Sequence, residues 1–181
     1  MPRINPLVID KADDGISAAF DDHKRRFNAQ ITNMKATLAL APPAFHAYMQ
    51  WYPLYEAVKK ITGERLAYLF AYSISFAADC PLCSTFFRKI IIDNGEKPED
   101  FKVNEKEQDL LSFGIAIAGN KGIITDDQVE KLKESYSDEE LVLLIAFAGQ
   151  MIATNIFNNV IETDIDDYLK DYLPVNKSNK L

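Results

Sequence analysis

Apolar residues recur at helical spacing along most of the chain. Over residues 16–38 they stand mostly three, four or seven positions apart, which is the period of an amphipathic helix. Pro42 and Pro43 end this segment, and a second helix follows over residues 44–61, closed by Gly63. Pro53 falls inside the second helix and predicts a kink or a division there. No run of residues is typical of a strand, so the pattern predicts an all-α helical bundle.

The helices further along the chain are predicted from their start and stop signals. Pro81 suits the first position of a helix, because its missing N–H is one that would lack an intrahelical partner anyway. Two capping boxes follow later in the chain, each pairing a hydroxyl with a Gln or Glu side chain three residues on. The segment over residues 64–78 is apolar on nearly every face, which places it at the centre of the bundle. Helices are predicted over residues 64–78, 81–93 and 109–118, from Thr125, from Ser137 and over residues 165–173.

Length and composition fit one domain over residues 1–181, with a polar tail at residues 174–181. The chain is 48% hydrophobic and 26% charged, which excludes a disordered protein. Its formal net charge of -7 argues against nucleic acid as a partner, because such partners need a basic face. Residues 1–15 lack the features of a secretory signal, so we expect a cytoplasmic protein.

Residues 141–161 carry no formal charge and are long enough to span a bilayer. Asn155, Asn158 and Asn159 would then lie in hydrocarbon, where amides are costly. We interpret the segment as a buried helix or an oligomer interface and expect no membrane partner. The three amides are expected to have a structural role.

Both cysteines of the chain lie in one motif, Cys80-Pro81-Leu82-Cys83, at a predicted helix start. In a cytosolic protein this spacing indicates a redox dithiol or half of a metal site. Cys83 would occupy the third helical position, where free backbone amides and the helix dipole favour thiolate. We therefore expect Cys83 to attack a substrate and Cys80 to resolve the product.

Two other interpretations of the motif compete with redox chemistry. A structural zinc site needs about four ligands, yet there is no second cysteine pair and His23 and His46 lie at no metal spacing. We expect neither a metal nor a cofactor. Alternatively, two small buried thiols fall three residues apart by chance.

A few further residues have candidate roles that the pattern does not favour. His46 could face the thiols as a base, although an interhelical position suits it better. His23 stands among charged residues and is predicted on a solvated face. Tyrosines and a tryptophan cluster at Tyr48, Trp51, Tyr52 and Tyr55, and we expect core or interface from them rather than a substrate platform.

The CPLC pair has neighbours in a recognisable order. They are the Ala41-Pro42-Pro43 entry, the aromatic helix, the DNG helix end, the SDEEL start and the run NIFNNVIETDIDD. Over roughly residues 33–169 the chain resembles the carboxymuconolactone decarboxylase family, in particular its alkylhydroperoxidase AhpD-like, peroxidase-related branch. The resemblance implies an all-helical, homo-oligomeric protein that reduces hydroperoxides in antioxidant defence with a thiol or dithiol reductant. It makes Cys83 the peroxidatic cysteine and Cys80 the resolving one.

The chain departs from this family at the proton relay. A histidine normally lies four residues after the second cysteine, where this chain has Phe87; a glutamate normally lies twelve before the first, where it has Tyr68. Phe87 cannot transfer a proton, and Tyr68 is a poor base at neutral pH. Glu64 lies one helical turn before Tyr68, so a shifted carboxylate acting through that tyrosine is a further hypothesis.

The sequence thus predicts a hydroperoxide reductase with Cys83, Cys80, Tyr68 and Glu64 as candidate catalytic residues. The first alternative is a non-catalytic or redox-sensing protein that has lost the Glu/His relay. A weaker alternative is lactone decarboxylase chemistry, which the family name permits.

Overall fold

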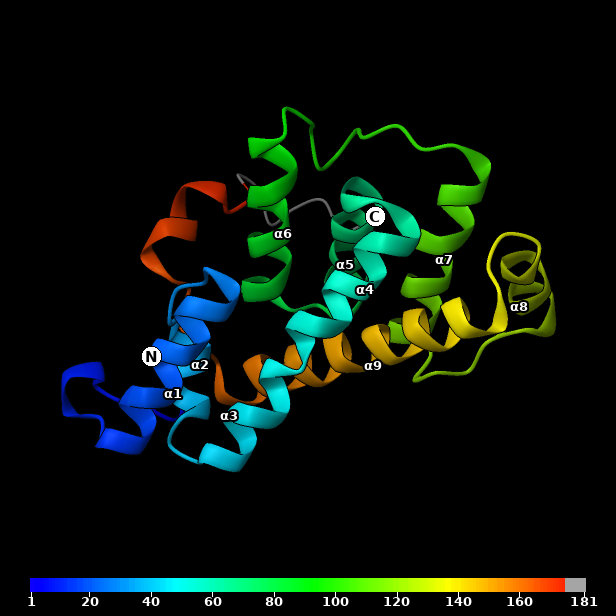
Figure 1. The fold of residues 1–181 in the computed structure, drawn as a ribbon. Coiled ribbons are helices and arrows are strands. Elements are labelled where there is room, and N and C mark those ends of the chain that lie inside the picture. The colour runs from blue at the N-terminus through cyan, green and yellow to red at the C-terminus, as the bar shows by residue number, and fades with distance from the viewer. Residues whose placement is uncertain (175–181) are drawn as a thin grey trace.

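The computed structural model describes residues 1–174, and these residues form helices and no strand (Figure 1). The predicted all-α class is therefore confirmed. Of the predicted tail, residues 175–181 lie outside the described residues. The helices are η1 (Ile9–Lys11), α1 (Asp14–Phe27), α2 (Asn33–Leu38), α3 (Pro42–Met49), α4 (Trp51–Thr62), α5 (Glu64–Ala77), α6 (Pro81–Asp93), α7 (Glu105–Gly119), α8 (Asp126–Lys133), α9 (Asp138–Ile161) and η2 (Asp167–Tyr172), where η marks a 3-10 helix.

Helix α5 is the centre of the bundle, as its apolar sequence predicts. It packs against α4, α6, α7 and α9, and in Figure 1 it lies behind α4, between α6 and α7. Leu69, Phe70 and Ile74 on this helix are fully buried. The close contact with α7 depends on Gly114, because a Cβ there would lie 2.7 Å from the Phe70 ring. The core thus surrounds the helix that leads directly into the cysteine motif.

The segment over residues 16–38 forms two helices where one was predicted. Asn28 adopts the left-handed conformation with φ 48°, which ends α1 at Phe27. Thr32 then caps the N-terminus of α2 through its side chain. Asparagine tolerates this backbone conformation better than most residues, and apolar periodicity does not report it. Met34 of α2 packs against the cluster that contains both cysteines.

The predicted second helix is divided at Gln50, three residues before Pro53. Helix α3 ends at Met49 and α4 begins at Trp51, with Gln50 between them. Pro53 consequently lies in the first turn of α4, where its missing N–H leaves no intrahelical bond unmade. Helix α6 has its predicted bounds, whereas α7 begins four residues early because Asn104 and Glu107 form a capping box.

Helix α9 has one buried and one exposed apolar face. It is long and apolar enough to cross a membrane, a test that core helices of soluble proteins also pass. Leu144, Phe147 and Met151 are buried, and the exposed face carries Val142, Ile145, Ile156 and Val160. The predicted oligomer interface on this segment stays a prediction.

Candidate active site

The two cysteines lie at the start of α6, as the motif predicts. Asp79, with φ 51°, turns the chain after α5, and Pro81 begins the helix. Cys80 is the N-cap: its Sγ accepts a hydrogen bond from the Cys83 N–H at 3.5 Å. Both residues are free thiols and buried, with Leu169 of η2 packed in the same cluster.

The helix start and the thiol contact stabilise negative charge on Cys80. Its pKa is lowered because the Cys83 thiol donates to it, with help from the Cys83 and Leu82 backbone N–H groups. The pKa of Cys83 is raised, because its thiol donates to Cys80 and is buried beside that charge. The helix-start pattern predicts the thiolate on Cys83. In the structure the N-cap sulfur of Cys80 faces the free amides instead, and the lowered pKa is that of Cys80.

Asn158 of α9 adds a further donor to the pair. Its Nδ2 donates to Cys83 Sγ at 3.2 Å, and this contact lowers the Cys83 pKa against the effects above. The Thr163 hydroxyl donates to Asn158 Oδ1 at 2.8 Å, which leaves the amide nitrogen facing the sulfur. Asn158 therefore stabilises a thiolate on Cys83 once that thiol has lost its proton.

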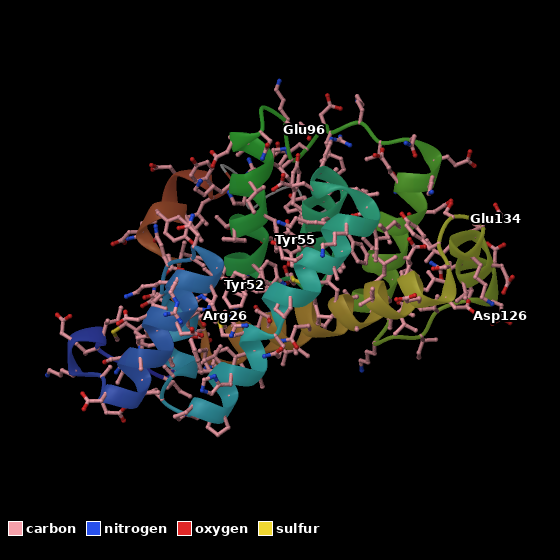
Figure 2. The ribbon with its side chains drawn as sticks, in the orientation of Figure 1. Arg26, Tyr52, Tyr55, Glu96, Asp126 and Glu134 are labelled. Atoms are coloured by element: carbon pink, nitrogen blue, oxygen red, sulfur yellow. The ribbon has the colours of Figure 1, made fainter. Side chains whose placement is uncertain are left out.

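Cys83 opens on a cavity of about 110 Å³, to which Cys80 does not contribute. Its lining is mostly apolar and aromatic and comes from distant parts of the chain. Tyr48, Trp51 and Tyr52 line it together with Phe86 and Phe87 of α6. In Figure 2, Tyr52 lies near the end of α6 that carries the cysteines. We call this space the Cys83 pocket.

A buried lysine also lines the Cys83 pocket. Lys35 of α2 is 6% exposed, and its Nζ lies 5.2 Å from the centre of the Tyr52 ring. Burial lowers its pKa to about 8, and the nearby Asp166 carboxylate opposes this shift. Asp166 lines the same pocket and accepts a hydrogen bond from the Asn33 N–H at 2.8 Å.

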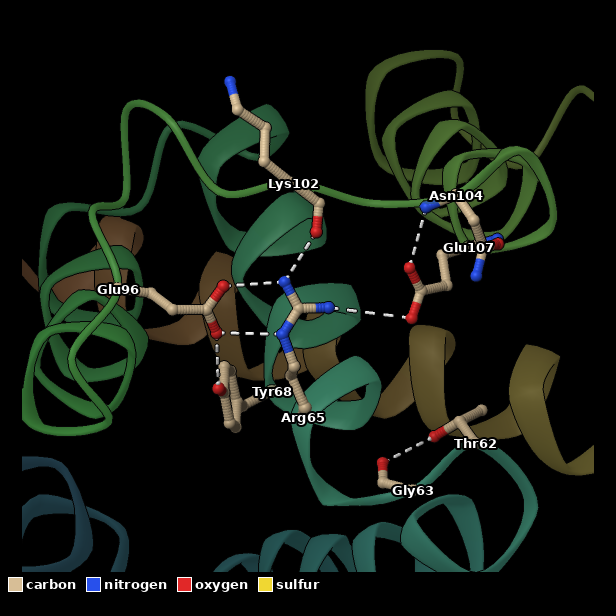
Figure 3. Close-up of polar contacts among 8 residues, drawn as sticks. All are labelled: Thr62, Gly63, Arg65, Tyr68, Glu96, Lys102, Asn104 and Glu107. Atoms are coloured by element: carbon tan, nitrogen blue, oxygen red, sulfur yellow. Dashed lines mark hydrogen bonds and ion pairs between the residues drawn. The ribbon is translucent and has the colours of Figure 1, made fainter.

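The structure does not bring Tyr68 or Glu64 to the cysteines. The Tyr68 hydroxyl donates to Glu96 at 3.0 Å, within a network in which Arg65 pairs with Glu96 (Figure 3). Glu96 follows the far end of α6, an end that is about 15 Å along the helix from Cys83, and Figure 2 shows it there. Glu64 is exposed. Neither side chain contributes to the lining of the Cys83 pocket.

The histidines occupy a separate surface cavity. His23 was predicted on a solvated face, and that prediction is wrong: it is 2% exposed, with its ring against Tyr52, Phe27 and Phe45. Helix periodicity explains this, because His23 is three residues after the buried Phe20. His46 is exposed and lines the same cavity, so it does not face the thiols. Within residues 1–174, no three His, Cys, Asp or Glu side chains gather as a metal site would require.

Sequence reasoning missed several residues of the Cys83 pocket. The aromatic cluster was assigned to core or interface, whereas Tyr48, Trp51 and Tyr52 line the pocket. Lys35 carried one usable signal, since it falls between Met34 and Leu38 on an otherwise apolar stripe. Asn158 was expected to be structural, and no sequence signal connects it to Cys83.

Comparisons with known proteins identify the fold. No protein-family model matches the sequence, and no curated protein matches it significantly. Two solved structures of the debrominase Bmp8 match with a TM-score of 0.77. The apo form is 18% identical over 93% of this chain and 95% of Bmp8. The second, a cysteine-to-alanine variant in complex with 2,3,4-tribromopyrrole, is 19% identical over 93% and 94%.

A third match is an uncharacterized peroxidase-related protein from Ralstonia eutropha JMP134, described as an alkylhydroperoxidase AhpD core. It is 16% identical, with a TM-score of 0.69, over 93% of this chain and 94% of that one. The chain therefore has the AhpD-like all-α fold, which confirms the fold that the sequence resemblance implies. At these identities the likeness establishes the fold alone.

Proposed function

We propose that this chain is a dithiol-dependent reductase that turns over a hydroperoxide at Cys83, with Cys80 as the resolving thiol. One observation carries the proposal: two buried free thiols at a helix start, where the Cys83 N–H donates to Cys80 Sγ and Cys83 opens on a pocket. Because the pocket lining is mostly apolar, the substrate is an organic hydroperoxide rather than hydrogen peroxide.

The proposed reaction balances as follows. Cys83 passes its proton to the Cys80 thiolate and attacks the distal peroxide oxygen, and the O–O bond breaks. The alkoxide takes that proton from Cys80 and leaves as the alcohol, so Cys80 is a thiolate again. Cys83 is then a sulfenic acid. The Cys80 thiolate attacks its sulfur, a disulfide forms and hydroxide leaves as water. An external thiol or dithiol reductant supplies two electrons and two protons to restore the pair.

The pair itself supplies the proton transfer that the missing relay would provide. Because the pKa of Cys80 is lowered, Cys80 is the group that takes the proton when Cys83 attacks. The Asn158 amide then steadies the new charge on Cys83. Phe87, at the relay histidine position, is 2% exposed and contributes only an apolar wall.

A halogenated aromatic ring is the second candidate substrate. The aromatic lining of the Cys83 pocket supports it, as does the likeness to a debrominase with a bound tribromopyrrole. Here the Cys83 thiolate takes the halogen from the ring carbon, which is protonated. Cys80 then attacks Cys83 and releases halide with formation of the same disulfide. The non-catalytic or redox-sensing alternative is the outcome in which neither substrate is reduced.

The experiment measures both candidate reactions with the reduced protein in the presence of a dithiol reductant. Cumene hydroperoxide loss and bromide release from 2,3,4-tribromopyrrole are measured for the wild type, Cys83→Ser and Cys80→Ser. We expect Cys83→Ser to abolish turnover, and Cys80→Ser to complete at most one attack. Turnover equal to the Cys83→Ser background with both substrates would overturn the proposal.

Phe87→His tests whether the pocket still accepts the relay. Since the pair transfers its own proton, we expect no rate gain from this change. A large gain would show that Cys80 is not the base.

A further inference from the structure

Lys35 is a buried ammonium whose charge is only partly offset by the nearby Asp166 carboxylate. Its Nζ donates to the Gln30 carbonyl at 2.5 Å and lies over the Tyr52 ring. Among residues 1–174 no carboxylate lies within ion-pair distance of it. An ammonium has three donors, so hydrogen-bonding capacity remains at the edge of the pocket.

A lysine in this position is costly unless something uses its charge. Burying an ammonium with incomplete pairing is unfavourable, and a methionine of similar length would pack there without that cost. Lys35 lines the same cavity as Cys83, Trp51 and Tyr52, and its Nζ lies over the Tyr52 ring. The cavity thus combines an apolar aromatic box with one cationic donor.

We propose that the Cys83 pocket selects aromatic ligands that carry an ionised acidic group, and that Lys35 binds this group. The ring packs among the aromatic side chains while the anion pairs with Lys35 Nζ. This inference deepens the proposed function and rests on it only for the identity of the reaction site, because binding itself does not need the thiols.

Among the residues that the structure describes, Asp166 is the one carboxylate that lines this pocket. Its Oδ1 accepts a hydrogen bond from the Asn33 N–H, and burial raises its pKa. We therefore expect Asp166 to compete only weakly with a bound anion for Lys35. An anionic ligand would still feel it as a repulsive charge. Removing that charge with Asp166→Asn should therefore strengthen the binding of an anion.

The single tryptophan of the chain provides the measurement. Trp51 lines the pocket, so a ligand that enters it changes the fluorescence of the only indole present. The probes are benzoate and benzamide, which share size and shape but differ in charge. Each is titrated into the reduced wild type at pH 7. We expect benzoate to bind at least tenfold more tightly than benzamide.

Single substitutions then show which side chain is responsible for the preference for benzoate over benzamide. Lys35→Met should abolish the preference for benzoate over benzamide. Lys59→Met is the matched control, because Lys59 also lies over a tyrosine ring, Tyr55, but pairs with Glu56 outside the pocket. It should behave like the wild type. Asp166→Asn should strengthen benzoate binding.

Equal binding of benzoate and benzamide by the wild type would overturn the inference without any variant, as would a preference that survives Lys35→Met. Cys83→Ser separates the two proposals. If it binds benzoate with the wild-type preference while the wild type shows no turnover, the proposed function fails and the inference stands. If turnover is seen without a preference for the anion, the reverse holds.

Discussion

The Asn158 amide nitrogen lies 3.2 Å from the Cys83 sulfur, and Thr163 determines that the nitrogen rather than the oxygen faces it. Asn158 lies on α9 and Cys83 on α6, and these helices are far apart in sequence. A donor aimed at a buried sulfur favours the thiolate over the thiol. Asn158 is therefore the side chain outside the CPLC motif that most directly sets the reactivity of Cys83.

Asn158→Leu should raise the pKa of Cys83 further and slow its reaction with iodoacetamide at pH 7 by about tenfold, the effect of one charge-assisted hydrogen bond of ~1.4 kcal/mol. Thr163→Val should have a smaller effect in the same direction, because it frees the amide to rotate. The rates are measured in a Cys80→Ser background, so that only Cys83 reacts. Unchanged rates in both variants would mean that the contact does not stabilise the thiolate.

Tyr68→Phe should leave thiol reactivity within about twofold of the wild type, because its hydroxyl is bonded to Glu96 at the far end of α6. The lost hydrogen bond should instead lower the free energy of unfolding by about 1 kcal/mol. Iodoacetamide kinetics and urea unfolding measure the two effects. A large fall in thiol reactivity with unchanged stability would mean that Tyr68 acts in catalysis.

His23→Phe should remove part of the acid sensitivity of the fold. Burial, reinforced by Lys35, lowers the His23 pKa from 6.5 to about 4. The unfolded chain therefore binds a proton between pH 6.5 and 4 that the folded chain does not, so stability falls as the pH falls through this window. The full shift corresponds to about 3 kcal/mol, and we expect about 2 kcal/mol because His23 borders a surface cavity.

Urea unfolding at pH 7 and pH 4 measures this effect as the difference between wild type and variant. His46→Gln is the matched control, since the other histidine of the chain is exposed. It should lose stability with acid as the wild type does. An identical acid response in His23→Phe would show that His23 is protonated in the folded protein.

Gly114→Ala should destabilise the fold by about 1–3 kcal/mol, because the added methyl overlaps the Phe70 ring where α5 and α7 meet. Gly119→Ala adds the same methyl to the same helix with no atom within 4 Å. It should change the free energy of unfolding by less than about 1 kcal/mol. Thermal unfolding compares the two; equal losses would mean that α7 shifts to accept the methyl.

Local signals predicted most of the helices because each acts within a few residues. Pro81 and Asn94 bound α6, and the Ser137 capping box begins α9, without reference to the rest of the fold. The apolar pattern does not predict the break between α1 and α2, because the break depends on the left-handed backbone of one residue, Asn28. An amphipathic stripe continues across such a turn and looks like one helix.

The candidate site was predictable only where it is local. The CPLC motif identified both thiols and their helix start, whereas the pocket around Cys83 is assembled from α2, α3, α4, α6, α9 and η2. Lys35 and Asn158 acquire their roles through contacts that no spacing along the chain encodes. Tyr68 occupies the position of the family's relay glutamate, but its hydroxyl donates to Glu96 instead.

The distribution of the pocket lining along the chain has a consequence for biosynthesis. Leu169 packs in the cysteine cluster, and Asp166 and Tyr168 complete the pocket, so its last wall is nearly the last part of the described chain to be translated. A nascent polypeptide consequently displays both thiols to solvent long after the motif has left the ribosome. In an incomplete chain both thiols are thus open to oxidation and to pairing with other chains, whereas in the complete fold both are buried and only Cys83 reaches the pocket.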